Sequence, residues 1–108
     1  MILRDRVTRL RAASVSTGYG NTKRDWANAA GVNYPASVTP QASDENVVDQ
    51  QRTVARWRLI LPATADVVVT DRIFWDGEVH EIDGEVERHK RRGRIHHLEA
   101  TLIKVKLS

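Results

Sequence analysis

The residues best able to do chemistry are the histidines and carboxylates of the C-terminal third of the chain. The segment His96-His97-x-Glu99 combines imidazole and carboxylate groups, which are typical zinc ligands. On a β-strand, His96 and His97 point to opposite faces, so only His97 and Glu99 share a side. Two ligands do not make a metal site. The sequence therefore predicts no metal and no cofactor here, and it favours ordinary surface or interface histidines.

A second candidate is an acidic cluster that could supply paired catalytic carboxylates. Its members are Asp76, Glu78, Glu81, Asp83, Glu85 and Glu87. No pair among them has the apolar surroundings that would drive two pKa values apart. The chain also lacks a glycine-rich phosphate motif, a nucleophile elbow and a His-Glu-x-x-His motif. We therefore expect no enzyme, and we interpret the cluster as a solvated acidic face or as the complement of a neighbour's arginines.

A third candidate is the basic segment 88–94, which the sequence pattern predicts to be a loop. Its cations are Arg88, Lys90, Arg91, Arg92 and Arg94. They could contact phosphates or an acidic protein face. The chain has only 6 aromatic residues to stack on unpaired bases. We therefore predict contact with an acidic protein face, as at a subunit interface, or non-specific contact with a duplex backbone.

These groups are positioned by β-structure, of which one hairpin is the clearest part. Asp76-Gly77 stands between two runs of β-formers, a strong signal for a two-residue turn. The predicted register pairs Arg72 with Glu81, Ile73 with His80, Phe74 with Val79, and Trp75 with Glu78. Ile73, Trp75, His80 and Ile82 then share the core face, where we expect His80 to be a hydrogen-bonded structural histidine. The apolar pair Phe74–Val79 lies outward, and we predict that it packs on an adjacent subunit or on the loop that carries Trp26.

The rest of the chain also reads as strands and turns. Strands are expected at 4–12, 34–38, 53–61 and, as the longest strand, 95–107. Residues 14–21 are expected to be a turn and 22–31 a loop, with Trp26 folded back on the barrel. Pro35 and Pro40 restrict the second strand to an edge or to irregular pairing. The fold class is thus all-β, a small β-barrel of about six strands within a single domain, 1–108.

Between the second and third strands the sequence predicts a long projecting loop, 43–51. It is polar and acidic and shows no periodicity. Its central residues are Asp44, Glu45, Asn46, Val47, Val48 and Asp49. Long loops in small domains are often functional, and a plain solvent loop is the other interpretation.

Composition and charge narrow the class further. The absence of cysteine excludes disulfides, thiolate metal sites and a cysteine nucleophile. Net charge is +3, distributed as +5 in 1–24, −4 in 25–50, +3 in 51–62, −7 in 63–87 and +6 in 88–108. Such alternating blocks can pair within a fold or between subunits. No secretion signal or membrane-spanning run is found, so we expect synthesis in the cytoplasm and no membrane contact.

The order of motifs resembles one family over nearly the whole chain. The motifs are Asp5–Arg11, Gly-Tyr-Gly-Asn at 18–21, Asp25-Trp26, Pro35–Pro40, Trp57–Pro62, Ala65-Asp66-Val67, Thr70–Ile73, Asp76-Gly77, His80–Gly84 and Arg94–Leu98. In this order and spacing the chain is similar to the head-to-tail stopper, or head-closure, proteins of long-tailed bacteriophages and prophages.

This resemblance implies a virion protein of the phage neck. It implies a ring of six or twelve copies below the adaptor and portal ring and above the tail terminator or tail tube. It also implies that loop 43–51 lies on the channel side and helps to retain double-stranded DNA. Asp44, Glu45 and Asp49 would repel DNA, which suits a conduit, whereas Val47 and Val48 could close the channel sterically.

Two classes of function therefore stay open from the sequence. The first is a ring-forming structural subunit of a virion connector. The second is a small β-barrel module that binds nucleic acid. Ring assembly would favour the first, and salt-dependent DNA binding by the monomer would favour the second.

Overall fold

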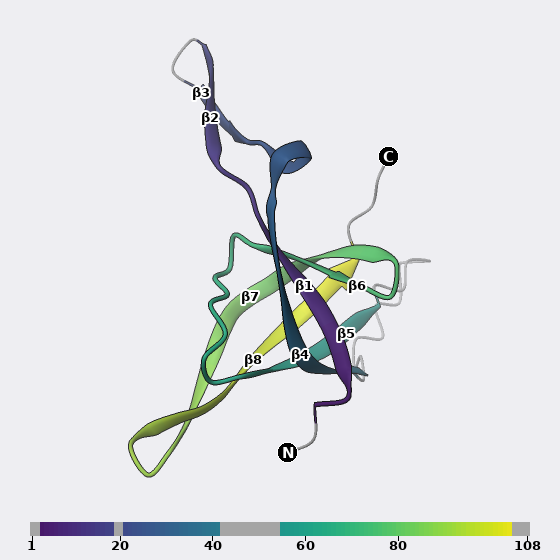
Figure 1. The fold of residues 1–108 in the computed structure, drawn as a ribbon, viewed down its shortest axis with the longest axis vertical. Coiled ribbons are helices and arrows are strands. Elements are labelled where there is room, and N and C mark those ends of the chain that lie inside the picture. Colours follow the sequence, from purple (N-terminus) through teal and green to yellow (C-terminus); the bar gives the residue numbers. More distant parts are fainter. Residues whose placement is uncertain (1–2, 19–20, 42–54, 105–108) are drawn as a thin grey trace, which may run out of the picture.

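The computed structural model describes residues 3–18, 21–41 and 55–104, which form a closed antiparallel barrel and a separate hairpin (Figure 1). Around the barrel the strands follow the order β1-β4-β5-β8-β7-β6. Their bounds are Asp5–Arg11 (β1), Ala30–Pro40 (β4), Arg56–Pro62 (β5), Arg72–Trp75 (β6), Glu78–Arg91 (β7) and Arg94–Lys104 (β8). The prediction of an all-β barrel of about six strands is confirmed. No helix in these ranges is long and apolar enough to cross a membrane.

The hairpin between β1 and β4 was not predicted. Strands β2 (Ser14–Gly18) and β3 (Asn21–Arg24) pair only with each other, and Figure 1 shows them beyond one end of the barrel. The predictions of a turn at 14–21 and a loop at 22–31 were therefore wrong. The glycine- and serine-rich composition indicated a turn, but it does not exclude a short ladder on either side of one.

A short 3-10 turn, η1 (Trp26–Asn28), then leads into β4. The guanidinium of Arg72 lies 4.1 Å from the centre of the Trp26 ring, a cation–π contact. The expectation that Trp26 folds back on the barrel is confirmed.

The hairpin of β6 and β7 has the predicted register at all four positions. Asp76 (φ 53°) and Gly77 (φ 76°) both adopt the left-handed conformation, as a two-residue type I′ turn requires. Aspartate and glycine are among the residues that tolerate this conformation best, so the turn sequence explains the register.

Alternating residues of the six barrel strands, with Val67, fill the core. The buried apolar side chains are Val7, Ala36, Val38, Leu59, Leu61, Val67, Ile73, Ile82, Leu98, Ala100 and Leu102. The core face predicted for the β6–β7 hairpin is confirmed by Ile73 and Ile82, and Trp75 packs against the same core.

His80 is fully buried, with its ring 5.1 Å from that of Trp57 and 5.7 Å from that of Trp75. The prediction of a hydrogen bond to this histidine is not met, since neither ring nitrogen has a partner among the described residues. Its ring packs edge-on against Trp57 and at an angle of 50° to Trp75, and an alternation pattern cannot distinguish such packing from hydrogen bonding.

Two further expectations about strands are corrected by the pairing. Of the two alternatives for the second strand, the edge position is excluded, because residues 30–36 of β4 pair with β1 and residues 37–40 pair with β5. This change of partner within one strand fits the other alternative, irregular pairing. Pro35 and Pro40 each belong to only one of these ladders, which is how a barrel strand accommodates a residue without an N–H. The longest described strand is β7, with 14 residues, because the basic segment pairs with β8 instead of forming a loop.

Candidate assembly surface

The basic segment 88–94 forms the tip of the β7–β8 hairpin. Residues 88–91 belong to β7 and Arg94 opens β8, so the predicted loop reduces to the two-residue turn Arg92-Gly93. His97 is the last residue of β8, counted towards the tip, that pairs with β5, where its partner is Pro62. From there to the turn, the described residues of β7 and β8 pair only with each other. It projects from the end of the barrel opposite the β2–β3 hairpin (Figure 1).

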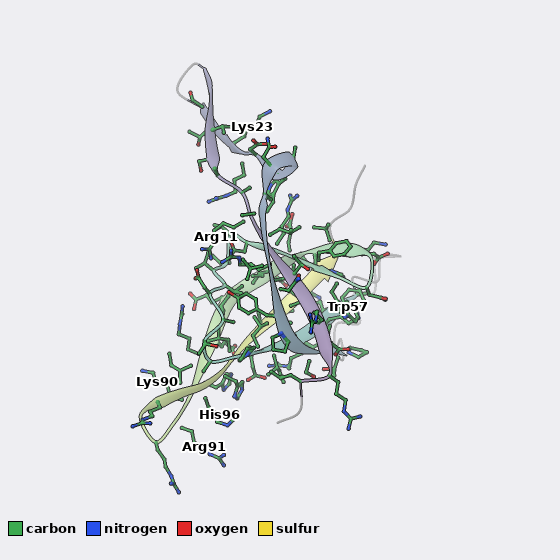
Figure 2. The ribbon with its side chains drawn as sticks, viewed as in Figure 1. Arg11, Lys23, Trp57, Lys90, Arg91 and His96 are labelled. Atoms are coloured by element: carbon green, nitrogen blue, oxygen red, sulfur yellow. The ribbon has the colours of Figure 1, made fainter. Side chains whose placement is uncertain are left out.

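The five predicted interface cations of this tip are all exposed. Among the described residues, no ion pair involves Arg88, Lys90, Arg91, Arg92 or Arg94. Figure 2 shows the labelled Lys90, Arg91 and His96 gathered there. A hollow at the tip is lined by Arg91, Arg92, Arg94, Ile95 and His96. Concentrated guanidinium groups of this kind can receive carboxylates or phosphates.

The acidic residues nearer the barrel are, by contrast, largely paired within the chain. Lys104 Nζ lies 2.9 Å from a carboxylate oxygen of Glu78, Arg56 Nε lies 3.1 Å from Asp83, and Arg72 Nη2 lies 3.6 Å from Glu81. These three carboxylates are exposed, as predicted, and they also have basic partners within the chain. The predicted register already paired Arg72 with Glu81, whereas the partners Arg56 and Lys104 come from β5 and β8 and cannot be read from the acidic segment alone.

A denser charged network joins β1 to the segment between β5 and β6. Arg11 donates from Nε and Nη2 to the two carboxylate oxygens of Asp71, each at 2.9 Å, and from Nη1 to Asp66 at 3.0 Å. Arg9, itself 7% exposed, donates to the Asp66 carbonyl at 3.0 Å. The hydrogen bond and charge of Arg11, joined by the charge of Arg9, lower the pKa of Asp66. The hydrogen bonds to Asp71 and Asp66 raise the pKa of Arg11.

Two apolar patches remain open on the outer surface. Phe74 is 42% exposed and pairs with the half-buried Val79, so the predicted outward pair is present. Its use as an interface stays a prediction. Sequence analysis missed the second patch, where Val68 and Val69 line a hollow together with Val67, Glu85, Val86 and Arg88. The run of three valines at 67–69 was the available signal.

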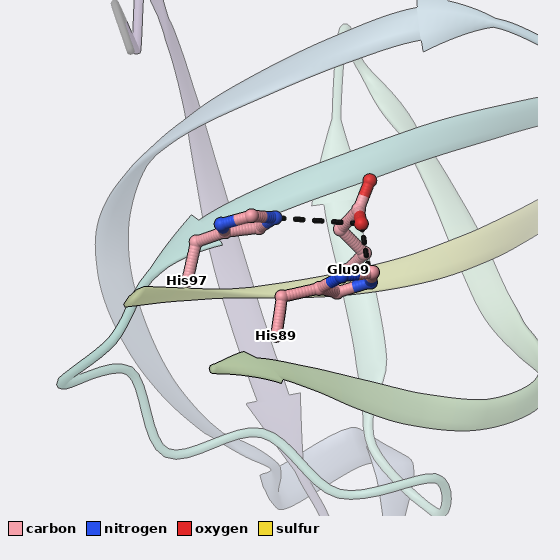
Figure 3. A group of neighbouring side chains, drawn as sticks. All are labelled: His89, His97 and Glu99. Carbon is pink, nitrogen blue, oxygen red and sulfur yellow. Dashed lines mark ion pairs between the residues drawn. The ribbon is translucent and has the colours of Figure 1, made fainter. Parts of the chain in front are cut away.

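The histidines form a group that sequence analysis also missed. Glu99 Oε2 faces Nε2 of both His89 and His97, at 3.4 Å from the latter (Figure 3). The two imidazoles are stacked, with ring centres 4.8 Å apart and planes 5° from parallel. The count of two possible ligands on this side was therefore wrong, because His89 arrives from β7, directly opposite His97.

Glu99 is held as a carboxylate by its neighbours. Partial burial raises its pKa, but hydrogen bonds from Arg58 and His97 and the charges of His89 and Arg58 lower the pKa below its ordinary value overall. Arg58 Nη1 donates to Oε1 at 3.0 Å, which leaves Oε2 to the imidazoles.

The predicted channel-side loop, 43–51, lies outside the described residues. The roles predicted for Asp44, Glu45, Asn46, Val47, Val48 and Asp49 therefore stay predictions.

The chain is similar to known proteins in sequence and in fold. The family described as phage head completion protein matches residues 2–103. The uncharacterized protein YqbH of Bacillus subtilis (strain 168) is 31% identical over 75 residues, 67% of this chain, and the match spans 57% of that relative's length.

Solved structures share the fold. A chain in the virion of a native gene transfer agent particle has a TM-score of 0.70 at 22% identity, with 96% of each chain covered. Protein SF1141 of Shigella flexneri 2a has a TM-score of 0.69 at 23% identity, with 94% of this chain and 92% of that chain covered. Protein xkdH of the phage-like element PBSX of B. subtilis has a TM-score of 0.50 at 17% identity, with 93% of this chain and 92% of that chain covered.

Proposed function

The chain belongs to the phage head completion protein family, and from this premise we propose that it is a ring-forming head-to-tail stopper of the neck. In this role six or twelve copies join the adaptor or portal ring to the tail terminator or tail tube and help to retain packaged double-stranded DNA. The protein acts in the virion as a structural subunit, without catalysis.

The observation that carries the ring proposal is the contrast between unpaired cations at one end of the β7–β8 hairpin and carboxylates at the other. Figure 1 shows the β7–β8 turn and the β6–β7 turn at well-separated places on the barrel. A cyclic ring places one face of each subunit against a different face of the next. The tip of one subunit, with Arg91 and Arg92, would then meet the acidic region around Asp76 of its neighbour or the acidic face of an adjacent ring.

The exposed apolar pair Phe74–Val79 supports an interface near the β6–β7 turn. Ring contacts need desolvated apolar area as well as charge, since exposed ion pairs contribute little affinity. We propose that Phe74 packs against a neighbouring subunit.

The channel-side role of loop 43–51 rests on the sequence and on family likeness. It connects β4 to β5, and its carboxylates at 44, 45 and 49 would let DNA pass without adhesion. Deleting residues 45–49 should leave a protein that still joins the particle but retains DNA poorly. Unchanged nuclease resistance of DNA in tail-less heads carrying the deletion would contradict this role.

Reversal of charge at the tip tests the ring proposal. In Arg91→Glu/Arg92→Glu, incorporation into heads that lack the protein should fall at least tenfold, measured as copies bound per purified particle. The control Arg4→Glu/Arg6→Glu makes the same change in net charge at two other exposed arginines and should incorporate normally. Normal incorporation of the tip variant would contradict the proposed contact, provided that its circular dichroism shows a folded barrel.

One observation favours the alternative of a nucleic-acid module, namely the arginine-lined hollow at the tip. Among the described residues, however, no Trp, Tyr or Phe lines that hollow, and His96 is the one aromatic ring there on which a base could stack. Binding of a duplex by the isolated protein, with affinity falling steeply between about 50 and 200 mM salt, would favour the alternative. The connector would be favoured if the tip variant fails to join particles and the wild-type protein does not bind a duplex.

A further inference from the structure

The outer face of the β7–β8 ladder carries a square of four metal-ligand side chains. Glu87 lies opposite Glu99 and His89 lies opposite His97, and each strand contributes residues two positions apart. Residues at this spacing share one face of a strand, and directly opposite Cβ atoms lie about 4.5–5.5 Å apart. The square forms only through the pairing of two strands, so neither strand shows it alone.

Three of these side chains converge on one point. His89 Nε2 and His97 Nε2 both face Oε2 of Glu99, and one ligand atom from each residue lies within 4.8 Å of the other two. Glu87 Oε2 is 3.1 Å from His89 Nε2 and adds negative charge at the open side. Ligand atoms about 2.0–2.2 Å from a tetrahedral zinc ion lie roughly 3.3–3.5 Å apart, so small side-chain rotations bring this group to coordination distance.

The neighbours leave the ligand atoms available. Arg58 occupies Oε1 of Glu99 and so orients Oε2 toward the imidazoles. His97 Nδ1 lies 2.8 Å from His96 Nδ1, so it can donate a hydrogen bond to His96 when a metal ion takes the place of the proton on Nε2 of His97. Partners of this kind, which bind the far side of a ligand, are typical of metal sites. The side chains of His97 and Glu99 are 17% and 13% exposed, whereas that of His89 is 43% exposed and leaves a path for an ion.

We propose that His89, His97 and Glu99 form a binding site for a divalent transition ion of the zinc class. Two imidazoles and a carboxylate are a known zinc donor set, and a water molecule or Glu87 can complete the coordination. The ion would join β7 to β8 at the base of the basic tip, where no other strand pairs with β7. This site does not depend on the proposed function in the neck.

The test is a titration of the untagged protein with zinc chloride, followed by calorimetry. We expect one zinc ion per chain, and a visible spectrum typical of tetrahedral coordination when cobalt replaces zinc. Because losing a partner of a ligand already costs about 10–100-fold in affinity, removal of a ligand in His89→Ala or His97→Ala should cost at least about 100-fold. His96→Ala, a neighbouring histidine outside the group of three, should lose less than the ligand variants, and Glu85→Gln should bind as the wild type does.

A second measurement is the melting temperature of the protein with and without zinc. Zinc should also raise the melting temperature of the wild type but not of His97→Ala, because an ion that binds only the folded state stabilises it. This second measurement covers the case in which a variant is less stable without metal. Absence of stoichiometric zinc binding by the wild type, or equal binding by wild type and both ligand variants, would overturn the proposal.

Discussion

Two type I′ turns at opposite ends of β7 are alike in backbone and different in use. Asp76-Gly77 has φ values of 53° and 76°, and Arg92-Gly93 has 53° and 77°. The first turn joins β6 to β7, and three carboxylates that follow it along β7, Glu78, Glu81 and Asp83, are paired with basic residues of the chain. The second carries arginines that have no ion-pair partner among the described residues.

The two turns differ in how well their first residue, Asp76 or Arg92, suits the left-handed conformation. An aspartate tolerates the left-handed conformation through its short polar side chain, whereas an arginine gains nothing there. A strained residue that serves no packing or pairing indicates a requirement outside the folded chain. We therefore propose that the barrel charges serve stability and the tip charges serve binding, and four predictions test this division.

The largest effect is expected from Asp71→Ala in the barrel network. The Asp71 side chain is 1% exposed, accepts two hydrogen bonds from Arg11, and accepts another from the backbone N–H of Val68 at 2.9 Å. Its loss should lower the free energy of unfolding by about 2–4 kcal/mol, measured by urea denaturation.

Glu81→Ala is the matched control for that prediction. Glu81 is 49% exposed and lies 3.6 Å from Arg72, so its removal should cost less than about 1 kcal/mol. Equal losses in the two variants would show that burial does not distinguish the barrel charges.

The sequence predicted the β6–β7 hairpin correctly because its turn residues and its alternation agreed. It could not predict the network around Asp71, because Arg11 and Asp71 are 60 positions apart in the sequence and are brought together only when the barrel forms. For the same reason it placed only His97 and Glu99 together and missed His89. Strand registers across a β7–β8 ladder that contains bulges cannot be read from either strand alone.

The basic segment was predicted to be a loop for a different reason. Its charge density suggested solvent exposure, which is correct, but exposure does not prevent pairing. The cations Arg88, Lys90, Arg91 and Arg94 are exposed and paired at once, because a projecting hairpin leaves their side chains in solvent while its backbone is paired.

The next largest effect compares alanine at the two turn glycines. No other atom lies within 4 Å of a Cβ added at Gly77 or Gly93, so the cost at each is backbone strain alone. Gly77→Ala should lower the free energy of unfolding by about 1–2 kcal/mol, because the barrel cannot close without this turn. Gly93→Ala should cost clearly less, because the tip can fray while the barrel stays paired.

Urea denaturation gives the global values, and amide hydrogen exchange separates the two sites. Faster exchange confined to the tip is expected for Gly93→Ala. Equal global losses would mean that the tip is coupled to the barrel and would weaken the division between the two regions.

A smaller effect of opposite sign is expected for Arg92→Asn. Asparagine tolerates the left-handed conformation better than arginine, so the tip should gain up to about 1 kcal/mol, seen as slower amide exchange near the turn. Asp76→Asn exchanges two tolerant residues at the same φ and should change little. If Arg92→Asn weakens incorporation into particles while it stabilises the tip, Arg92 serves binding at the expense of local stability. Destabilisation of the tip by this change would contradict that conclusion.

The smallest effect concerns acid and the exposed carboxylate of Asp66. Hydrogen bonding to Arg11 lowers the pKa of Asp66 in the folded state below its ordinary 3.8. A carboxyl with a lowered pKa stabilises the folded state above that ordinary value, and this contribution is lost as the pH falls below it. Asp66→Asn should therefore flatten the fall in unfolding free energy below about pH 4, and the difference should shrink in high salt because the pair is exposed. Identical acid dependence in wild type and variant would show that the charge of Asp66, unlike that of Asp71, does not contribute to the free energy of unfolding. Asp66 would then resemble the tip arginines, whose charges are not used within the fold.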